Sequence, residues 1–186
     1  MSLLAISEGR TSGPLQPIPR WPHAGWLNVL LAIVVFHWIE HLSQAAQIWI
    51  LHWDRVDALG LIGLVFPSLV RTEVLHFGYA TVMLTGLIAL VPAVRPIART
   101  WWWIAVAVQV WHFFEHLLLQ LQYITGWRLT DANAPTSVIQ LFFPRVELHI
   151  LYNLLVIVPM MLALSLHWFP PEEHDAALMP DPAGAS

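Results

Sequence analysis

Four long apolar stretches constrain the fold of this chain more than any other feature. They run over about residues 25–50, 71–94, 100–124 and 145–168. Each is longer than the roughly 20 residues that an α-helix needs to cross the hydrocarbon core of a bilayer. Backbone groups cannot be left unpaired in lipid, so continuous apolar runs favour helices, which pair these groups internally. The sequence therefore predicts an all-α membrane protein, folded as a four-transmembrane-helix bundle.

The composition agrees with a location in the membrane and limits the chemistry. Only 11% of the 186 residues are charged, whereas a soluble domain carries ~25%. The net charge is −4 and no basic run exists, so nucleic-acid binding has no electrostatic support. Cysteine is absent, which excludes disulfides, iron–sulfur clusters and thiolate metal sites. A metal site in this chain must therefore use imidazole, carboxylate or water ligands.

The two ends of the chain differ from the apolar stretches. Residues 1–24 are rich in Pro, Gly and Ser, and we expect a surface or disordered arm rather than a signal peptide. Residues 169–186 combine acidic residues with prolines, and we expect a disordered acidic tail. The transmembrane domain is then residues 25–168. Its connectors, 51–71 and 125–144, each hold a short apolar run that we expect at the membrane interface.

Two of the apolar stretches contain the same polar pattern, His-x-x-Glu-His. It occupies residues 37–41 in the first stretch and 112–116 in the third. Positions i, i+3 and i+4 share one face of a helix, so each copy presents two imidazoles with a carboxylate between them. Ionisable groups are costly inside a membrane and mark functional sites by default. The pattern predicts a site where helices hold metal.

An internal repeat retains mostly the polar residues of the membrane segments. Aligning the two motifs, with a two-residue deletion further on, gives the pairs Glu40–Glu115, Gln47–Gln122, His76–His149 and Tyr79–Tyr152. Unrelated hydrophobic helices would share Leu and Val, not His, Glu, Gln and Tyr in phase. The sequence therefore predicts two tandem repeated helical hairpins, residues 25–94 and 100–168, related by a parallel repeat.

The candidate ligands are predicted to lie at one depth in the membrane. With a rise of ~1.5 Å per residue, the motif histidines lie roughly 18–24 Å along the first and third helices. The histidines of the second and fourth helices lie only ~6–8 Å from the starts of helices that run the other way. All six imidazoles then share one layer near the connectors. The candidate metal ligands are His37, Glu40, His41, Glu73, His76, His112, Glu115, His116 and His149.

Such a ligand set suits two transition-metal ions, iron or copper, and zinc fits as well. Dimetal carboxylate bundles use Glu-x-x-His on two of their helices, and Glu73 and His76 have that spacing. Glu147 and His149 are ~200° apart around a helix and cannot both face one centre, so His149 is preferred. Alternatively, three imidazoles hold each ion and the two motif carboxylates bridge the ions or support the ligands.

Two tyrosines follow ligand histidines by three residues. Tyr79 and Tyr152 are therefore candidate catalytic residues, either as hydrogen-bond donors or as redox-active tyrosines. Gln44, Gln47, Gln120 and Gln122 are expected to hydrogen-bond between helices.

The motif spacing resembles the histidine boxes of membrane fatty-acid hydroxylases and desaturases. Those families carry further boxes of paired adjacent histidines, and this chain has none. His-x-x-Glu-His also matches the inverted zinc-protease motif, which works once per active site with a distant Glu. Because the copies here are duplicated and intramembrane, the sequence assigns the chain to neither family.

Three function classes are compatible with these residues. The working hypothesis is an oxidoreductase with a dinuclear iron or copper centre that acts on a small apolar or lipid substrate. The second class is a b-type haem electron carrier, but two His at i and i+4 cannot bind opposite faces of one haem iron. The third is a metal or proton transporter, but the half of the bundle away from the connectors lacks a polar path. A hydrogen-bonded polar core without metal is the alternative to all three.

The arginines predict the orientation and the partners. Both sides of the membrane carry four Arg, but Arg71 and Arg145 begin helices beside the predicted site. Discounting these two, the positive-inside rule places both termini in the cytoplasm, and we expect a bacterial plasma membrane. The expected partners are the lipid bilayer and a small apolar substrate or redox partner. The sequence predicts no particular oligomeric state.

Overall fold

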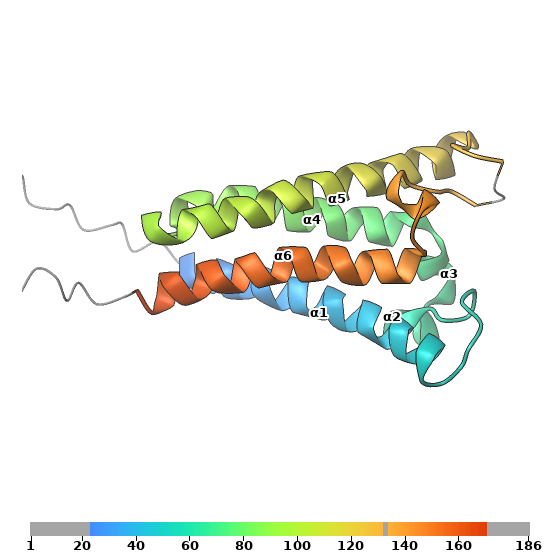
Figure 1. The fold of residues 1–186 in the computed structure, drawn as a ribbon, viewed down its shortest axis with the longest axis horizontal. Coiled ribbons are helices and arrows are strands. Elements are labelled where there is room, and N and C mark those ends of the chain that lie inside the picture. Colours follow the sequence, from blue (N-terminus) through green and yellow to red (C-terminus); the bar gives the residue numbers. More distant parts are fainter. Residues whose placement is uncertain (1–22, 132–133, 171–186) are drawn as a thin grey trace, which may run out of the picture.

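Four long helices lie side by side in the computed structural model, which describes residues 23–131 and 134–170 (Figure 1). They are α1 (His23–Trp49), α4 (Glu73–Leu90), α5 (Arg99–Thr125) and α6 (Arg145–Trp168). All four are long and apolar enough to cross a membrane, and no strand occurs in the described ranges. The predicted all-α architecture with four spanning helices is therefore confirmed.

The two connectors lie together at one end of the bundle (Figure 1). The first contains α2 (Gly60–Val65) and α3 (Pro67–Arg71), and the second contains the single turn η3 (Ile139–Leu141). Pro67 begins α3, where its missing N–H costs no helical hydrogen bond. The short turns η1 (Val91–Ala93) and η2 (Pro96–Ala98) join α4 to α5 at the opposite end.

The predicted N-terminal arm and C-terminal tail fall mostly outside the described residues. Only residues 23–24 of the arm and 169–170 of the tail belong to the described part.

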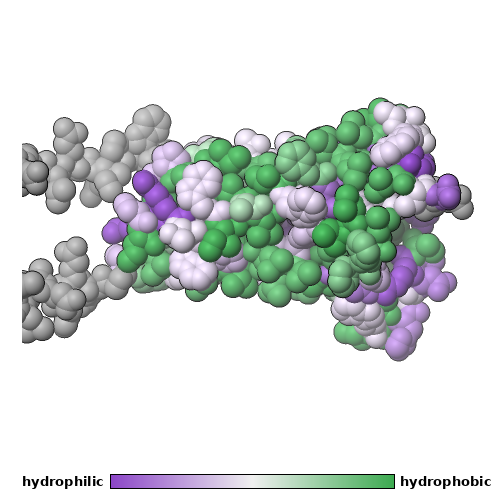
Figure 2. Space-filling view, turned by 45° about the horizontal axis from the view of Figure 1, so that its top comes forward, coloured by the Kyte–Doolittle hydropathy of each residue, from purple (hydrophilic) through white to green (hydrophobic). Residues whose placement is uncertain are grey.

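Apolar side chains cover the outside of the bundle, and polar side chains are buried within it. On α1, Phe36 and Ile39 are exposed while the adjacent His37 and Glu40 are buried. Figure 2 shows hydrophobic residues over most of one face, with hydrophilic residues gathered toward the two ends. A soluble protein has the opposite distribution because water solvates its polar groups. In a bilayer this pattern places the apolar surface in lipid and the polar groups in the bundle interior.

The half of the bundle farther from the connectors has an apolar core. Leu27, Leu87, Trp102 and Met160 pack there from all four helices. The Trp102 indole N–H donates to the Leu87 backbone carbonyl at 2.8 Å, so this buried donor is satisfied. At the boundary with the polar half, the Gln109 amide donates to a backbone carbonyl of α4 at 3.2 Å. The buried polar side chains therefore lie in the half of the bundle next to the connectors.

Candidate metal centre

Six of the ten histidines form one buried cluster in the connector half. Each long helix contributes: His37 and His41 from α1, His76 from α4, His112 and His116 from α5, and His149 from α6. The ring of His149 lies 4.9 Å from those of His41 and His116, measured between centroids. The ring of His76 lies 5.9 Å from the same two rings. The structure therefore brings together all six histidines that the sequence analysis selected.

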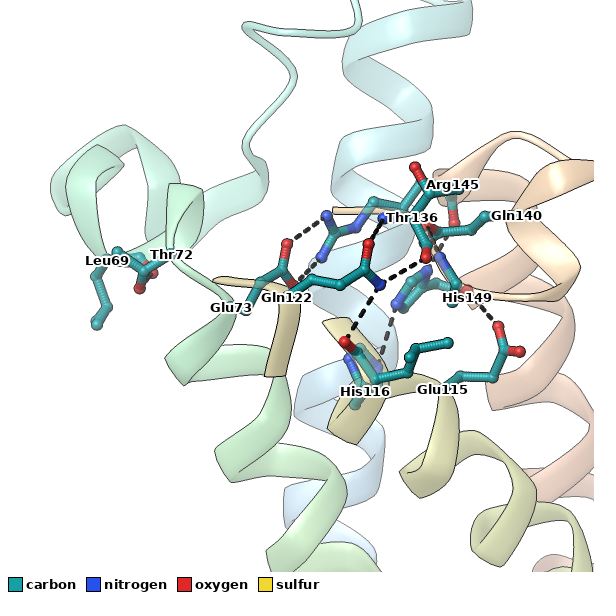
Figure 3. Close-up of polar contacts among 12 residues, drawn as sticks. Leu69, Thr72, Glu73, Glu115, His116, Gln122, Thr136, Gln140, Arg145 and His149 are labelled. Atoms are coloured by element: carbon teal, nitrogen blue, oxygen red, sulfur yellow. Dashed lines mark hydrogen bonds and ion pairs between the residues drawn. The ribbon is translucent and has the colours of Figure 1, made fainter. Parts of the chain in front are cut away.

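The Nε2 atoms of neighbouring imidazoles are close enough to share an ion. They are 3.2 Å apart in the His37–His41 pair and 3.0 Å apart in the His112–His116 pair. The Nε2 atoms of His116 and His149 are 3.2 Å apart. Figure 3 draws this contact as a dashed line. Two nitrogens each ~2.1 Å from one ion at ordinary coordination angles are themselves about 3.0–3.4 Å apart. In addition, the donor atoms of His112, His116 and His149 all lie within 4.8 Å of one another.

Two of the rings are held in one tautomer by carbonyl oxygens. The Nδ1 atom of His41 lies 2.8 Å from the side-chain oxygen of Gln44, and that of His149 lies 2.7 Å from the backbone oxygen of Arg145. A carbonyl oxygen only accepts, so both Nδ1 atoms carry the hydrogen and donate it. The lone pair of each neutral ring is then on Nε2, which faces the cluster. Metal-binding histidines are commonly oriented by the same kind of contact.

Four ring nitrogens of the cluster are not satisfied by protein groups. The Nδ1 atoms of His37, His76, His112 and His116 are buried and have no hydrogen-bond partner among the described residues. An unsatisfied buried polar atom costs ~1–3 kcal/mol, and so many in one place call for water or an ion. The donor set is therefore suited to a metal that prefers imidazole ligands, such as iron, copper or zinc.

The Glu40 carboxylate faces the first connector rather than the imidazoles. It accepts hydrogen bonds from the backbone N–H groups of Leu61 and Ile62 at 3.1 and 2.9 Å. Gly60 has a φ of +73°, and a Cβ there would lie 2.7 Å from the Glu40 carboxyl carbon. Because successive helical residues are 100° apart, Glu40 is about 60° around α1 from His37. This rotation is enough to direct the carboxylate to α2 while the imidazole faces the cluster.

Glu115 has the corresponding position in the second half. Its carboxylate accepts hydrogen bonds from the Ser137 hydroxyl and from the backbone N–H of Ile139. The two motif carboxylates therefore bind the two connectors. From the sequence we expected them to bridge two metal ions or to support the ligands. In the structure they contact the connectors at the end of the histidine cluster.

The side-chain amides of two glutamines bind backbone groups of the same connectors. Gln47 accepts from the Gly60 N–H at 2.8 Å and donates to the Gly60 carbonyl at 3.3 Å. Gln122 donates to the Thr136 carbonyl at 2.8 Å and accepts from the Thr136 N–H at 3.3 Å. Each amide thus pairs with both backbone groups of one connector residue. We expected interhelical hydrogen bonds from these glutamines, and they bind connectors instead.

Glu73 forms an ion pair at the edge of the cluster. The Arg145 guanidinium donates to its two carboxylate oxygens at 2.8 and 2.5 Å (Figure 3). This two-point contact uses both oxygens of a carboxylate that is 4% exposed, which is the strong geometry for such a pair. Glu147 pairs in the same way with Arg55, at 2.9 and 2.6 Å, and this contact raises the pKa of Arg55. Both acidic groups are thus oriented toward arginines.

Each candidate tyrosine packs on one histidine of the cluster. The ring centroid of Tyr79 lies 4.7 Å from that of His37, and Tyr152 lies 4.8 Å from His112. The Tyr152 hydroxyl accepts a hydrogen bond from the Trp111 indole at 2.7 Å. The Tyr79 hydroxyl has no such bond among the described residues. The two tyrosines therefore differ in what their hydroxyls can still bind.

A cavity joins the cluster to the connector end of the molecule. Its volume is about 250 Å³, and three imidazoles, those of His41, His76 and His149, line its inner part. Arg55 and Arg71 line it as well, and both residues are exposed. Small polar molecules can therefore approach the histidines from the connector side.

Sequence reasoning missed Ser137, named Arg145 only as the start of a helix beside the site, and expected Gln44 to hydrogen-bond between helices. Arg145 pairs with Glu73, Ser137 binds Glu115, and Gln44 accepts from His41 within α1 rather than between helices. The position of Gln44, three residues after His41, was a usable signal because i and i+3 share a helical face. Comparisons with protein-family models, with curated proteins and with solved structures find no match for this chain.

Proposed function

We propose that this chain is an integral membrane oxidoreductase with a dinuclear iron or copper centre. The observation that supports it is the cluster of six buried imidazoles from four spanning helices, four of whose ring nitrogens lack a partner among the described residues. A polar core evolved only to join helices would satisfy its own donors and acceptors. This cluster leaves four Nδ1 atoms unpartnered, and its Nε2 atoms face one another at the spacing of a coordination sphere.

We assign the histidines to two sets of three. One set is His112, His116 and His149, whose donor atoms lie within 4.8 Å of one another. The other is His37, His41 and His76, in which the first two Nε2 atoms are 3.2 Å apart. Since the motif carboxylates and Glu73 have other partners, we assign the ligands as imidazole alone. Such a set disfavours magnesium, calcium and manganese, which prefer oxygen ligands.

We also propose that the bundle consists of two repeated hairpins. Residues paired in the sequence repeat make corresponding contacts in the two halves. Glu40 and Glu115 bind connectors, Gln47 and Gln122 each bind one connector residue at two points, and Tyr79 and Tyr152 pack on the first motif histidine. These correspondences support a duplication that brought two three-histidine sets face to face.

The chemistry follows from what surrounds the ligands. Two bound transition-metal ions would supply electron transfer and activation of dioxygen. Gln44 and the Arg145 carbonyl orient two ligand rings, so these rings need not reorganise on binding. Tyr79 and Tyr152 touch ligand rings and can carry a proton or an electron. The apolar core below the cluster excludes water, and the connector-side cavity admits small polar molecules.

Two observations favour this function over the alternatives. The axial ligands of a haem iron lie on opposite faces of a porphyrin, yet the ring of His149 is in contact distance of both His41 and His116. A transporter needs access from both sides of the membrane, and the apolar core closes the far side of the cluster. We place the termini in the cytoplasm, with the connectors outside.

Metal analysis with an absorption spectrum of the detergent-purified protein tests the proposal. We expect about two equivalents of iron or copper and no Soret band. His41→Ala and His116→Ala, one in each set, should each lower the metal content, because each set then has two ligands. His167→Ala, at the far end of α6, is the control and should bind metal normally. Folded protein without metal, or an unchanged content in either cluster variant, would contradict the proposal.

A further inference from the structure

A long apolar groove runs along the outer face of the seam between α1 and α4. It consists of two adjoining hollows of about 420 and 380 Å³. Trp26 and Leu90 line the first hollow, and Tyr79 lines the second. The hollows share Ile33 and Val82, which makes them continuous. From Val74 to Leu90 the groove follows α4 for about 24 Å.

Two glycines of α4 create this space. A Cβ at Gly78 would meet nothing within 4 Å, and a Cβ at Gly86 would approach Leu30 to 2.7 Å. The sequence repeat aligns these glycines with Leu151 and Pro159 of α6. The second hairpin therefore carries side chains where the first hairpin has none. This difference breaks the symmetry of the repeat on one side of the bundle.

One residue that lines the groove is a tyrosine that contacts the cluster. Tyr79 lines the second hollow and packs on His37 at 4.7 Å. Its hydroxyl is without a hydrogen bond among the described residues, whereas Trp111 occupies the hydroxyl of Tyr152. The groove thus combines an apolar channel on the outer face of the bundle with one unused polar group on its wall, next to a proposed metal ligand.

We propose that this groove binds a quinol, with its isoprenoid tail along α1 and α4 and a head oxygen accepting a hydrogen bond from Tyr79. No charged residue lines either hollow, so the carboxylate of a fatty acid or the phosphate of a phospholipid would find no counterion there. A quinol has a neutral head with hydrogen-bonding oxygens and a long apolar tail. It is also an electron donor, and this choice rests on the proposed function.

Photolabelling tests the groove directly. The full-length protein in nanodiscs is labelled with an azido-quinone that carries a decyl tail, and the labelled peptides are mapped by mass spectrometry. Label should attach to the α4 segment containing Tyr79, and unlabelled decyl-quinone should compete for it. Label elsewhere only, or equal competition by decanol or by a short-chain phospholipid, would overturn the quinol assignment.

A matched pair of glycine variants provides the control. Gly78→Leu adds a side chain to the wall of the second hollow, where a Cβ meets nothing within 4 Å, and we expect labelling to fall at least about tenfold. Gly25→Leu places the same side chain on α1, at a position where a Cβ also meets nothing within 4 Å. Gly25 lines neither hollow, so labelling should be unchanged. Tyr79→Phe removes only the hydroxyl and should weaken binding about three- to tenfold. Wild-type labelling of Gly78→Leu would refute the groove.

Metal content, measured on the same samples, separates this inference from the proposed function. Gly78→Leu should retain its metal while it loses the quinone, because the change is on the lipid side of α4. If wild-type protein lacks metal but its groove is labelled competitively, the metal centre fails and the groove assignment stands. If metal is bound and Gly78→Leu labels normally, the groove fails and the metal centre stands.

Discussion

The ion pair between Glu73 and Arg145 decides whether Glu73 is a structural residue or a metal ligand. It joins α4 to α6 one helical turn before the cluster, since His76 and His149 follow the two partners by three and four residues. Charge reversal of both residues, Glu73→Arg with Arg145→Glu, exchanges the partners across the same helix interface. A structural pair tolerates this exchange, and a ligand carboxylate does not.

The expected energies follow from burial and geometry. The Glu73 side chain is 5% exposed and that of Arg145 is 38% exposed, and two hydrogen bonds join them. Removing one partner of a fully buried pair costs ~3–5 kcal/mol, and the partial exposure of Arg145 lowers this through solvent screening. We therefore expect Glu73→Ala to destabilise the protein by about 2 kcal/mol. The exposed Arg55–Glu147 pair, at 50% and 29% exposure, should contribute much less than this, because water screens it.

Unfolding in mixed detergent micelles, together with metal analysis, measures both effects. Glu147→Ala is the matched control because it removes the carboxylate of an equally well-formed but exposed pair. The double charge reversal should recover most of the stability lost in either single variant and should bind metal at the wild-type level. Loss of about half the metal in the recovered double variant would refute the structural role and restore Glu73 as a ligand.

Two further predictions concern the groups that support the site. Gly60→Ala should destabilise the protein by at least about 1 kcal/mol more than Gly126→Ala, as measured by thermal unfolding. Both glycines have a φ of +73°, so the backbone strain of an alanine is common to the two variants and cancels in their difference. Only at Gly60 would a Cβ meet a neighbour, the Glu40 carboxylate. Equal losses of stability would contradict this reasoning. Gln44→Leu should lower metal affinity by about 10- to 100-fold because it removes the acceptor that orients His41. Gln120→Leu removes an amide whose oxygen has no partner among the described residues and should leave affinity unchanged in the same chelator titration.

The convergence of the six histidines could be predicted because it depends only on regular geometry. The rise per residue and the alternating direction of the helices fix the depth of each residue. His37 and His149 are far apart in sequence, yet their distances along their helices place both residues at the same depth. The observed helices begin and end within about two residues of the predicted bounds, the usual uncertainty of helix ends, except that α4 ends at Leu90 and continues as the turn η1.

The partners of the carboxylates could not be predicted in the same way. Glu40 and its connector meet only when the connector folds back over the bundle, and a rotation of about 60° decides which neighbour the side chain faces. For Glu73 a signal was present. The proposed repeat aligns it with Val146, so it lies outside the residues that the two halves share, and a role outside the histidine set was the simpler prediction.

The way the connectors are fastened has a consequence for how such a protein can diverge. Glu40, Gln47 and Gln122 hold them mainly through backbone N–H and carbonyl groups. Every residue except proline offers the same backbone donor and acceptor, so most connector positions can mutate without releasing these bonds. The helices can keep a fixed set of anchoring side chains while each connector acquires its own length and shape. One connector contains two short helices and the described part of the other contains a single turn, above a histidine cluster drawn from all four helices.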